Sequence, residues 1–254
     1  MNIQIHLNNR NQRLFLTLVL MTAFDGLLLL FRLYKMNSIP DEIPRIGTLT
    51  RYRGYTFLFL AWNLFLAWIP YLFALILERK AWRGSSLWQL LPIFCCWLLF
   101  FPNAPYIVTD LLHLQHRPPL PLWYDLLVLF SFAWTGLMLG FLSLLKVHRV
   151  LDVQIGKKMG WLVVLASIGL TGFGVYLGRF LRWNSWDIVT QPLALFQDIG
   201  RVLSQPLLHL NTFGLAIVLT AILMLGYFML LALSSPTSAD TSPMINDDYK
   251  YKSI

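Results

Sequence analysis

Four acidic and imidazole side chains are the strongest candidates for chemistry in this sequence. Asp110 and His113 stand three residues apart, so on a helix they share one face. With Asp125 or Asp187 they can supply three ligands to zinc or another divalent metal and leave a fourth position open for water. Alternatively, His113 acts as a general base that a carboxylate orients. The competing explanation is structural: Asp110 caps a short interfacial helix and His113 points at lipid headgroups.

A second group of polar residues is suited to binding an anion or a polar headgroup. Arg179 and Arg182 follow an apolar run, and their guanidinium groups can make bidentate contacts with phosphate or carboxylate. A phospholipid or lipid-linked headgroup is the obvious anion in that position, and simple snorkelling to the headgroups is the alternative. The expected ligand-binding residues are Asn103, Tyr106, Tyr124, Arg179, Arg182 and Asn184.

Asp25 is the clearest ionisable residue inside an apolar run. A charge in hydrocarbon is costly and usually has a partner, so we expect an intramembrane ion pair in which Arg179 or Arg182 is the counter-ion. Such a pair can belong to a functional site or can simply hold two spans together.

The composition places these residues in a membrane protein. The chain has 254 residues, of which 57% are hydrophobic and 13% are charged, whereas soluble domains carry about 25% charged residues. Several apolar runs reach the roughly 20 residues that cross a bilayer as a helix. The net charge of +8 therefore concerns topology and anionic lipid headgroups, and no soluble basic module is present for nucleic acid. The adjacent Cys95 and Cys96 fit neither a disulfide framework nor a metal motif.

We predict an all-α bundle of about six transmembrane helices in one domain, residues 1–233, followed by a disordered polar tail, residues 234–254. The third span is too short to cross as one helix, because Pro102 and Pro105 break it after Phe101. Phe101 and Ala104, each preceding a proline, are expected to be extended. Irregular backbone at membrane depth must be covered by protein or a wet cavity. The predicted spans are Leu14–Phe31, Tyr55–Leu77, the span from Leu87 to the break, Leu122–Leu145, Trp161–Phe180 and Thr212–Leu233.

Two further patterns bear on packing. Gly136 and Gly140, and likewise Gly174 and Gly178, are small residues four apart that allow helices to approach closely, within one chain or in a dimer. Residues 188–210 contain an amphipathic pattern typical of an interfacial helix. Its apolar positions are Leu195, Phe196, Ile199, Val202 and Leu203, and its polar positions are Gln197, Asp198, Arg201 and Ser204.

In an alternating six-span chain, the candidate residues all fall on one side of the bilayer. This predicts a headgroup-facing polar pocket between the broken third span and the ends of the fifth and first spans. Lys and Arg residues outside the tail divide nine to nine between the two sides. The short second and fourth loops are strongly basic, however, which favours a cytoplasmic N-terminus.

Three runs of this sequence resemble a bacterial family of multi-span membrane proteins, domain-of-unknown-function family 1361. They are FFPNAPYIVTDLLHL, PLWYDLL and GRFLRWNSWD, and the resemblance extends over roughly residues 60–230. It implies a multi-pass protein of the bacterial inner membrane and supplies no catalytic roles. The positions that match the family's motifs are Pro102, Asn103, Pro105, Tyr106, Asp110, His113, Asp125, Arg179, Arg182 and Asp187.

Three classes of function follow from these observations. The first is an enzyme acting on a lipid or lipid-linked headgroup, with or without a divalent metal cofactor. The second is a small carrier that binds an anionic headgroup or solute, since broken helices occur near transporter binding sites. The third is a non-catalytic accessory subunit. Membrane lipids are the expected partners, with a membrane protein or a second copy of the chain as further candidates and no nucleic acid.

Overall fold

The computed structural model of the chain describes residues 2–37, 57–116, 118–204 and 210–234. Within these ranges the chain is helical apart from turns and short loops. The elements are α1 (Asn2–Asn37), α2 (Leu58–Trp82), α3 (Leu87–Phe100), α4 (Asn103–Tyr106), the 3-10 helix η2 (Ile107–His113), α5 (Leu122–Ile155), α6 (Lys157–Phe180), α7 (Asp187–Thr190), α8 (Pro192–Ser204) and α9 (Leu210–Ser234).

The prediction of six spans is confirmed, and the protein is a multi-pass membrane protein. The described residues contain six stretches that are long and apolar enough to cross a bilayer. The third stretch is formed by α3, α4 and η2 together. The six are Asn11–Met36, Leu58–Trp82, Leu87–His113, Leu122–Ile155, Lys157–Phe180 and Phe213–Ser234.

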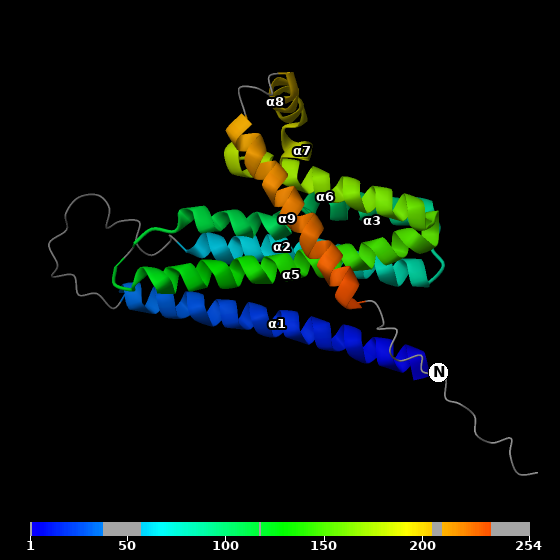
Figure 1. Cartoon of the computed structure of the whole chain (residues 1–254), viewed down its shortest axis with the longest axis horizontal. Coiled ribbons are helices and arrows are strands. Elements are labelled where there is room, and N and C mark those ends of the chain that lie inside the picture. Colours follow the sequence, from blue (N-terminus) through cyan, green and yellow to red (C-terminus); the bar gives the residue numbers. More distant parts are fainter. Residues whose placement is uncertain (1, 38–56, 117, 205–209, 235–254) are drawn as a thin grey trace, which may run out of the picture.

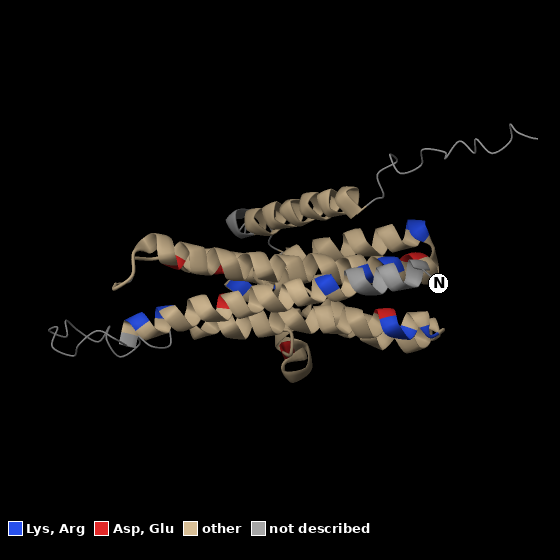
Figure 2. Cartoon of the chain, turned by 90° about the horizontal axis from the view of Figure 1, so that it is seen from below, with Lys and Arg blue, Asp and Glu red and all other residues tan. Residues whose placement is uncertain are grey.

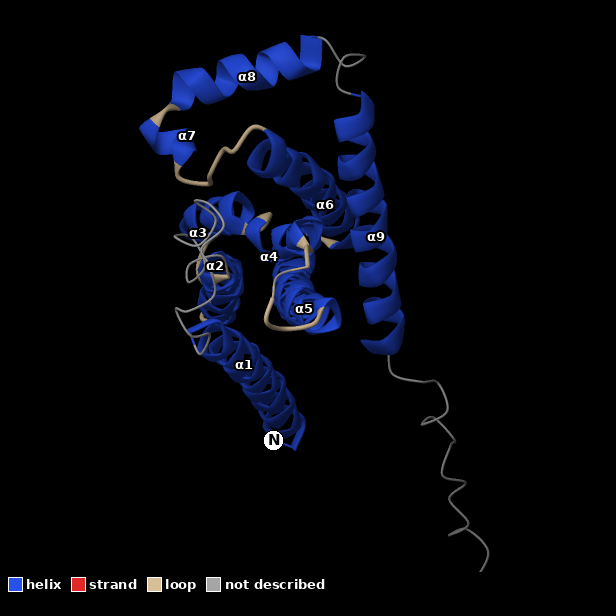
Figure 3. Ribbon diagram, turned by 90° about the vertical axis from the view of Figure 1, so that its left-hand side faces the viewer, coloured by secondary structure: helices blue, strands red, loops and turns tan. Residues whose placement is uncertain are grey.

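The helices form one bundle with two elements that depart from its axis (Figure 1). α2 packs on both α3 and α5, α1 packs on α5, and α6 lies between α5 and α9. α9 crosses α6 obliquely, and α8 lies across the outside of the bundle between α7 and the start of α9 (Figure 3). The four-residue helix α4 contacts α2, α5 and α6, so the broken segment sits inside the bundle.

The break in the third span interrupts the helical hydrogen bonds but leaves the backbone torsion angles helical. Phe101 is helical, with φ −57° and ψ −37°, and Ala104 lies within α4. The expectation that both residues are extended is therefore wrong. Pro102 and Pro105 fall at the start and in the first turn of a new short helix, where a missing backbone donor is tolerated.

Local contacts replace the helical hydrogen bonds that the break removes. The Ala104 N–H donates to the Phe101 carbonyl at 3.2 Å rather than to that of Phe100. The freed Phe100 carbonyl instead accepts a hydrogen bond from the side-chain amide of Asn103 at 2.9 Å. Asn103 thus supplies a partner for a carbonyl that the break leaves without its helical hydrogen bond.

The four glycines of the small-residue pairs all face the broken segment. An added Cβ at Gly136 would lie 2.7 Å from the Ala104 carbonyl oxygen, and one at Gly140 would lie 3.3 Å from the Ala104 Cβ. On the other side, a Cβ at Gly174 would lie 2.9 Å from Pro102 Cγ, and one at Gly178 would lie 3.3 Å from Tyr106. α5 and α6 therefore pack closely against the break through their glycines. The small-residue pairs thus serve helix packing within the chain.

The fourth and fifth spans differ from the prediction. α5 continues to Ile155, and Gly156, at φ +85°, joins it to α6, which begins at Lys157. Lys146 is therefore a buried helical residue, with its Nζ 2.5 Å from Glu78 Oε2, and not part of a basic loop. The cytoplasmic N-terminus remains a prediction; Figure 2 shows several Lys and Arg residues at the end of the bundle where the N-terminus lies.

The predicted amphipathic helix is present as α8, with Pro192 as its first residue. Leu195 and Val202 are buried, whereas Gln197 and Arg201 are exposed. The apolar stripe is narrower than the sequence pattern, because Phe196 is 60% exposed. The predicted tail lies outside the described residues except for Ser234, which ends α9.

We expect Gly136→Ala to destabilise the protein, because the new methyl group would meet a backbone oxygen that cannot rotate away. Overpacking of this kind typically costs about 1–3 kcal/mol. The measurement is thermal unfolding of the purified protein in detergent. Gly169→Ala is the matched control, since its Cβ would meet nothing within 4 Å, and it should leave stability unchanged or slightly raised. Equal effects of the two substitutions would contradict the role of Gly136 in close packing against the break.

Candidate functional site

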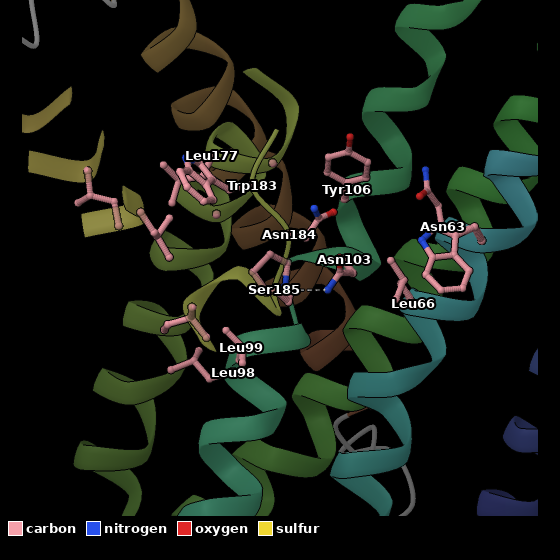
Figure 4. A pocket seen from close by; sticks show the side chains of 17 residues that line it. Asn63, Leu66, Leu98, Leu99, Asn103, Tyr106, Leu177, Trp183, Asn184 and Ser185 are labelled. Carbon is pink, nitrogen blue, oxygen red and sulfur yellow. Dashed lines mark hydrogen bonds between the residues drawn. The ribbon is translucent and has the colours of Figure 1, made fainter. Parts of the chain in front are cut away.

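A cavity of about 310 Å³ lies beside the broken segment. It is enclosed by α2, the break between α3 and α4, the last turns of α6, the loop after α6, and α8 (Figure 4). Its lining residues are Trp62, Asn63, Leu66, Leu98, Leu99, Pro102, Asn103, Tyr106, Gly174, Leu177, Gly178, Trp183, Asn184, Ser185, Ile188, Leu195 and Ile199.

The polar groups of this cavity are amides and hydroxyls. Asn103 donates a hydrogen bond from its side-chain amide to Ser185 Oγ at 2.9 Å, which ties the break to the loop after α6 (Figure 4). Asn63, Tyr106 and Asn184 complete the polar side. The rest of the lining is aliphatic or aromatic, and these described lining residues include no charged side chain.

A buried carboxylate lies directly behind this polar side. Asn63 donates from its side-chain amide to Asp110 Oδ2 at 2.8 Å. Arg179 Nη1 lies 3.5 Å from Asp110 Oδ1, and its guanidinium carbon lies 6.0 Å from the centre of the Tyr106 ring. Asp110 is only 1% exposed. Asn63 and Tyr106 thus connect the cavity with an ion pair that does not itself line it.

Asp125 belongs to a different set of contacts. Arg32 approaches it with two nitrogens, Nε at 2.7 Å from Oδ1 and Nη2 at 3.0 Å from Oδ2, and both side chains are buried. The neighbouring Tyr124 donates its hydroxyl to the Leu28 carbonyl at 2.8 Å. Asp125 and Tyr124 therefore hold α1 against α5 and do not line the cavity. Bidentate pairing of this kind fixes orientation as well as distance.

The expected ion pair between Asp25 and Arg179 or Arg182 is not formed. Arg179 is paired with Asp110, and Arg182 is exposed. Asp25 is fully buried and accepts a hydrogen bond from the Ser131 hydroxyl, while its Oδ2 has no hydrogen-bond partner among the described residues. Asp25 thus contributes a third polar contact between α1 and α5.

Asp187 shapes the loop that closes the cavity. Its Oδ2 accepts the Asn184 backbone N–H at 2.7 Å and the Asn184 side-chain amide at 3.2 Å, and its Oδ1 accepts the Thr190 hydroxyl at 3.1 Å. The bond from the backbone N–H of Asn184 lowers the pKa of the Asp187 carboxyl below its ordinary value. Arg182, at φ +61°, makes the turn that leads from α6 into this loop.

His113 is exposed at the end of η2, where its ring meets the edge of Phe59 with 5.4 Å between centroids. Asp110, Asp125 and Asp187 each have a different set of partners, given above. Across the described part of the chain, no three His, Cys, Asp or Glu side chains gather in a way that could hold a metal ion. The structure therefore does not bring the predicted metal ligands Asp110, His113 and Asp125 together.

The cavity is lined by the third and fifth spans, as predicted for the one-sided pocket, but the first span is replaced by other elements. Asn103, Tyr106 and Asn184 line the cavity as expected. None of the described residues that line the cavity belongs to the first span. α2 and α8 take that place through Trp62, Asn63 and Leu195. Asn63 could have been singled out, because an amide in the middle of an apolar span needs a partner. Ser185 carries no comparable signal in the sequence.

The comparisons with known proteins identify a family. The family of proteins of unknown function DUF1361 matches residues 62–225. Every described residue that lines the cavity falls within the matched range, and so do Asp110 and Arg179, while α1 with Arg32 and Asp25 precedes it. No curated protein and no solved structure matches the chain.

The Arg32–Asp125 pair predicts an asymmetric response to substitution. Asp125→Leu alone leaves a buried guanidinium without its carboxylate, which we expect to lower the free energy of unfolding by about 3–5 kcal/mol. The double variant Arg32→Met/Asp125→Leu should recover most of that loss, because a well-packed apolar pair avoids the desolvation cost. Unfolding in detergent with increasing dodecyl sulfate measures both. A double variant as unstable as the single one would contradict a purely structural role for Asp125.

The lowered pKa of Asp187 predicts a pH dependence for the loop. Its contribution to stability is complete above the unfolded-state value of 3.8 and is lost as the pH falls through the lower folded-state value. Hydrogen exchange of residues 183–190, corrected for intrinsic rates, should therefore rise on strong acidification. Asp187→Asn should already show rapid exchange at neutral pH and little further change. Identical pH profiles for the two proteins would refute this role.

Proposed function

We propose that this chain, which belongs to the DUF1361 family of proteins of unknown function, binds a lipid-like amphiphile with an uncharged, hydrogen-bonding headgroup in the cavity beside its broken third span. The observation that carries the proposal is the make-up of the lining. Amides and hydroxyls converge on one side, aliphatic and aromatic side chains form the rest, and no charged residue is among the described lining residues.

The polar side of the cavity favours a headgroup that both donates and accepts hydrogen bonds. A side-chain amide offers two donors and an acceptor, and a hydroxyl offers both functions. Asn63, Asn103, Asn184 and the hydroxyl of Tyr106 can therefore match alcohol, amide or sugar groups. A phosphate or carboxylate would instead favour a cation in direct contact. Arg179 does not line the cavity and faces Asp110 instead.

The apolar walls favour a ligand that comes from the membrane. Leu66, Leu98, Leu99 and Leu177 contribute apolar side chains to the lining, together with the aromatic ring of Trp183. A volume of about 310 Å³ is at the small end of the range for ligand sites, roughly 300–1,000 Å³. It suits a headgroup and the first carbons of a chain rather than a complete lipid.

The position of α8 also favours a ligand that comes from the membrane. The cavity is covered by Ile188 and by Leu195 and Ile199, which lie on the apolar side of an amphipathic helix. Such helices lie in the plane of the membrane interface. Trp183 also donates its indole N–H to Asp198 Oδ2 at 3.1 Å, which fixes α8 over the cavity. A ligand there would have its headgroup under α8 and its chain directed toward lipid.

A second candidate is an enzyme that acts on the same headgroup. The observation in its favour is the Asn63–Asp110 hydrogen bond, which places a buried carboxyl one side chain away from the cavity. In that case Asp110 is the acid or base, and the ligand is turned over as well as bound. The accessory-subunit alternative differs from both, because it requires no small-molecule ligand in the cavity.

Binding is tested with two amphiphiles of the same chain length that differ by one phosphate group: a monoacylglycerol and the corresponding lysophosphatidic acid. Titrations followed by native mass spectrometry should show preferential retention of the uncharged lipid. Leu99→Trp should abolish that preference by filling the cavity. Leu91→Trp is the matched control on the same helix, because Leu91 is exposed and does not line the cavity, and it should bind normally.

Tyr106→Phe sharpens the test, since it removes one hydroxyl and keeps the ring. We expect about 2- to 10-fold weaker binding, the usual effect of one neutral hydrogen bond. Preference for lysophosphatidic acid, or equal binding by the Leu99→Trp and Leu91→Trp variants, would reject the proposal. Conversion of the bound lipid by the wild type, lost in Asp110→Asn, would instead identify the enzyme.

A further inference from the structure

A second cavity, of about 130 Å³, lies between α1, α5 and α9 and shares no described residue with the first. Figure 3 looks along the bundle and shows α1 and α9 on either side of α5. The residues that line the cavity are Asn11, Leu14, Leu142, Leu145, Lys146, Arg149, Leu230, Leu233 and Ser234.

The ends of the helices place this cavity at the level of the lipid headgroups. Asn11 precedes the first span predicted from the sequence, Leu14–Phe31, and Ser234 follows the sixth, Thr212–Leu233. Both lie where hydrocarbon gives way to the polar interface. Leu142 and Leu230 lie at least one turn deeper, whereas Leu14, Leu145 and Leu233 lie within a turn of the polar residues. The cavity is therefore apolar on the membrane side and polar toward the interface.

The charge at the polar end is positive and is not cancelled by the lining. Lys146 is paired with Glu78, with 2.5 Å between Nζ and Oε2, so that pair is neutral overall. Arg149 is exposed, and no acidic side chain of the described residues forms an ion pair with it. The described lining contains no Asp or Glu. The cavity therefore carries about one net positive charge through a group suited to phosphate.

We propose that this cavity binds an anionic phospholipid. The Arg149 guanidinium holds the phosphate, the Asn11 amide and the Ser234 hydroxyl contact the headgroup, and an acyl chain lies against the five leucines. A guanidinium at the interface beside an apolar groove matches both ends of such a lipid. An apolar partner helix would leave Arg149 without an anion, and a soluble anion would leave the leucines without an apolar partner. This site is independent of the function proposed above for the first cavity.

A bound lipid would have a structural role at this place. α1 packs on α5, while α9 packs on α6. A phospholipid in the cavity contacts α1, α5 and α9 together, and so it links the first and last spans of the chain. We therefore expect the lipid both to bind selectively and to stabilise the protein.

The test compares phosphatidylglycerol with phosphatidylcholine of the same acyl chains, added to the delipidated full-length protein and followed by native mass spectrometry. Wild type should retain phosphatidylglycerol preferentially and unfold at a higher temperature in its presence. Arg149→Gln should reduce that preference roughly tenfold, the usual effect of losing a charge-assisted hydrogen bond, and Arg149→Lys should restore part of it. Inorganic phosphate should not displace the lipid, because it lacks the acyl chain.

Lys158→Gln is the matched control, since it removes an exposed cation next to the α5–α6 junction that does not line the cavity. It should leave the preference unchanged. Equal retention of the two lipids by wild type, or equal losses in Arg149→Gln and Lys158→Gln, would overturn the proposal. So would a dimer that retains no lipid and dissociates in Arg149→Gln, because a second copy would then cover the cavity. Leu99→Trp should not affect any of these results, which separates this site from the first one.

Discussion

The structure depends on satisfying the backbone that two prolines leave without helical hydrogen bonds inside a membrane. Hydrocarbon offers no partner for an unpaired carbonyl, so protein must supply one. Here the partner is the amide of Asn103, which bonds the Phe100 carbonyl. The same segment can be enclosed only because α5 and α6 present glycines to it, with an added Cβ at Gly136 blocked by the Ala104 carbonyl. The cavity beside the break follows from this arrangement, since Asn103 also bonds Ser185 and so brings the loop after α6 over the break.

The acidic residues show how the chain distributes its buried charges. Asp110 faces Asn63 and Arg179, and Asp125 faces Arg32. Separate partners hold the carboxylates apart and give each a different role. Asp125 on α5 and Asp25 on α1 hold the first span against α5, whereas Asp110 positions Asn63, which lines the cavity. A ligand site without a charge in its lining is then compatible with a chain whose net charge is +8.

Much of the fold could be predicted from the sequence, because span length, hydropathy and the proline break are local properties. The candidate site was predictable in part: Asn103, Tyr106 and Asn184 line the cavity, but the pairing of charges was not foreseen. Arg32 lies seven residues after Asp25, two turns along one helix face. Its burial nevertheless depends on where α5 places Asp125, which is a tertiary fact. A cation after an apolar run predicts the end of a span, so the sequence places Lys146 in a loop, whereas its contact with Glu78 explains its place inside α5.

The single-residue junction at Gly156 has a consequence for the surface that the protein offers to the bilayer. α5 has 34 residues and α6 has 24, and the two run back along each other from that junction. At 1.5 Å per residue they extend about 51 Å and about 36 Å. α6 therefore stops roughly 15 Å short of the far end of α5. The face that carries α7 and α8 is accordingly stepped rather than flat, because the first turns of α5 project beyond the last turn of α6.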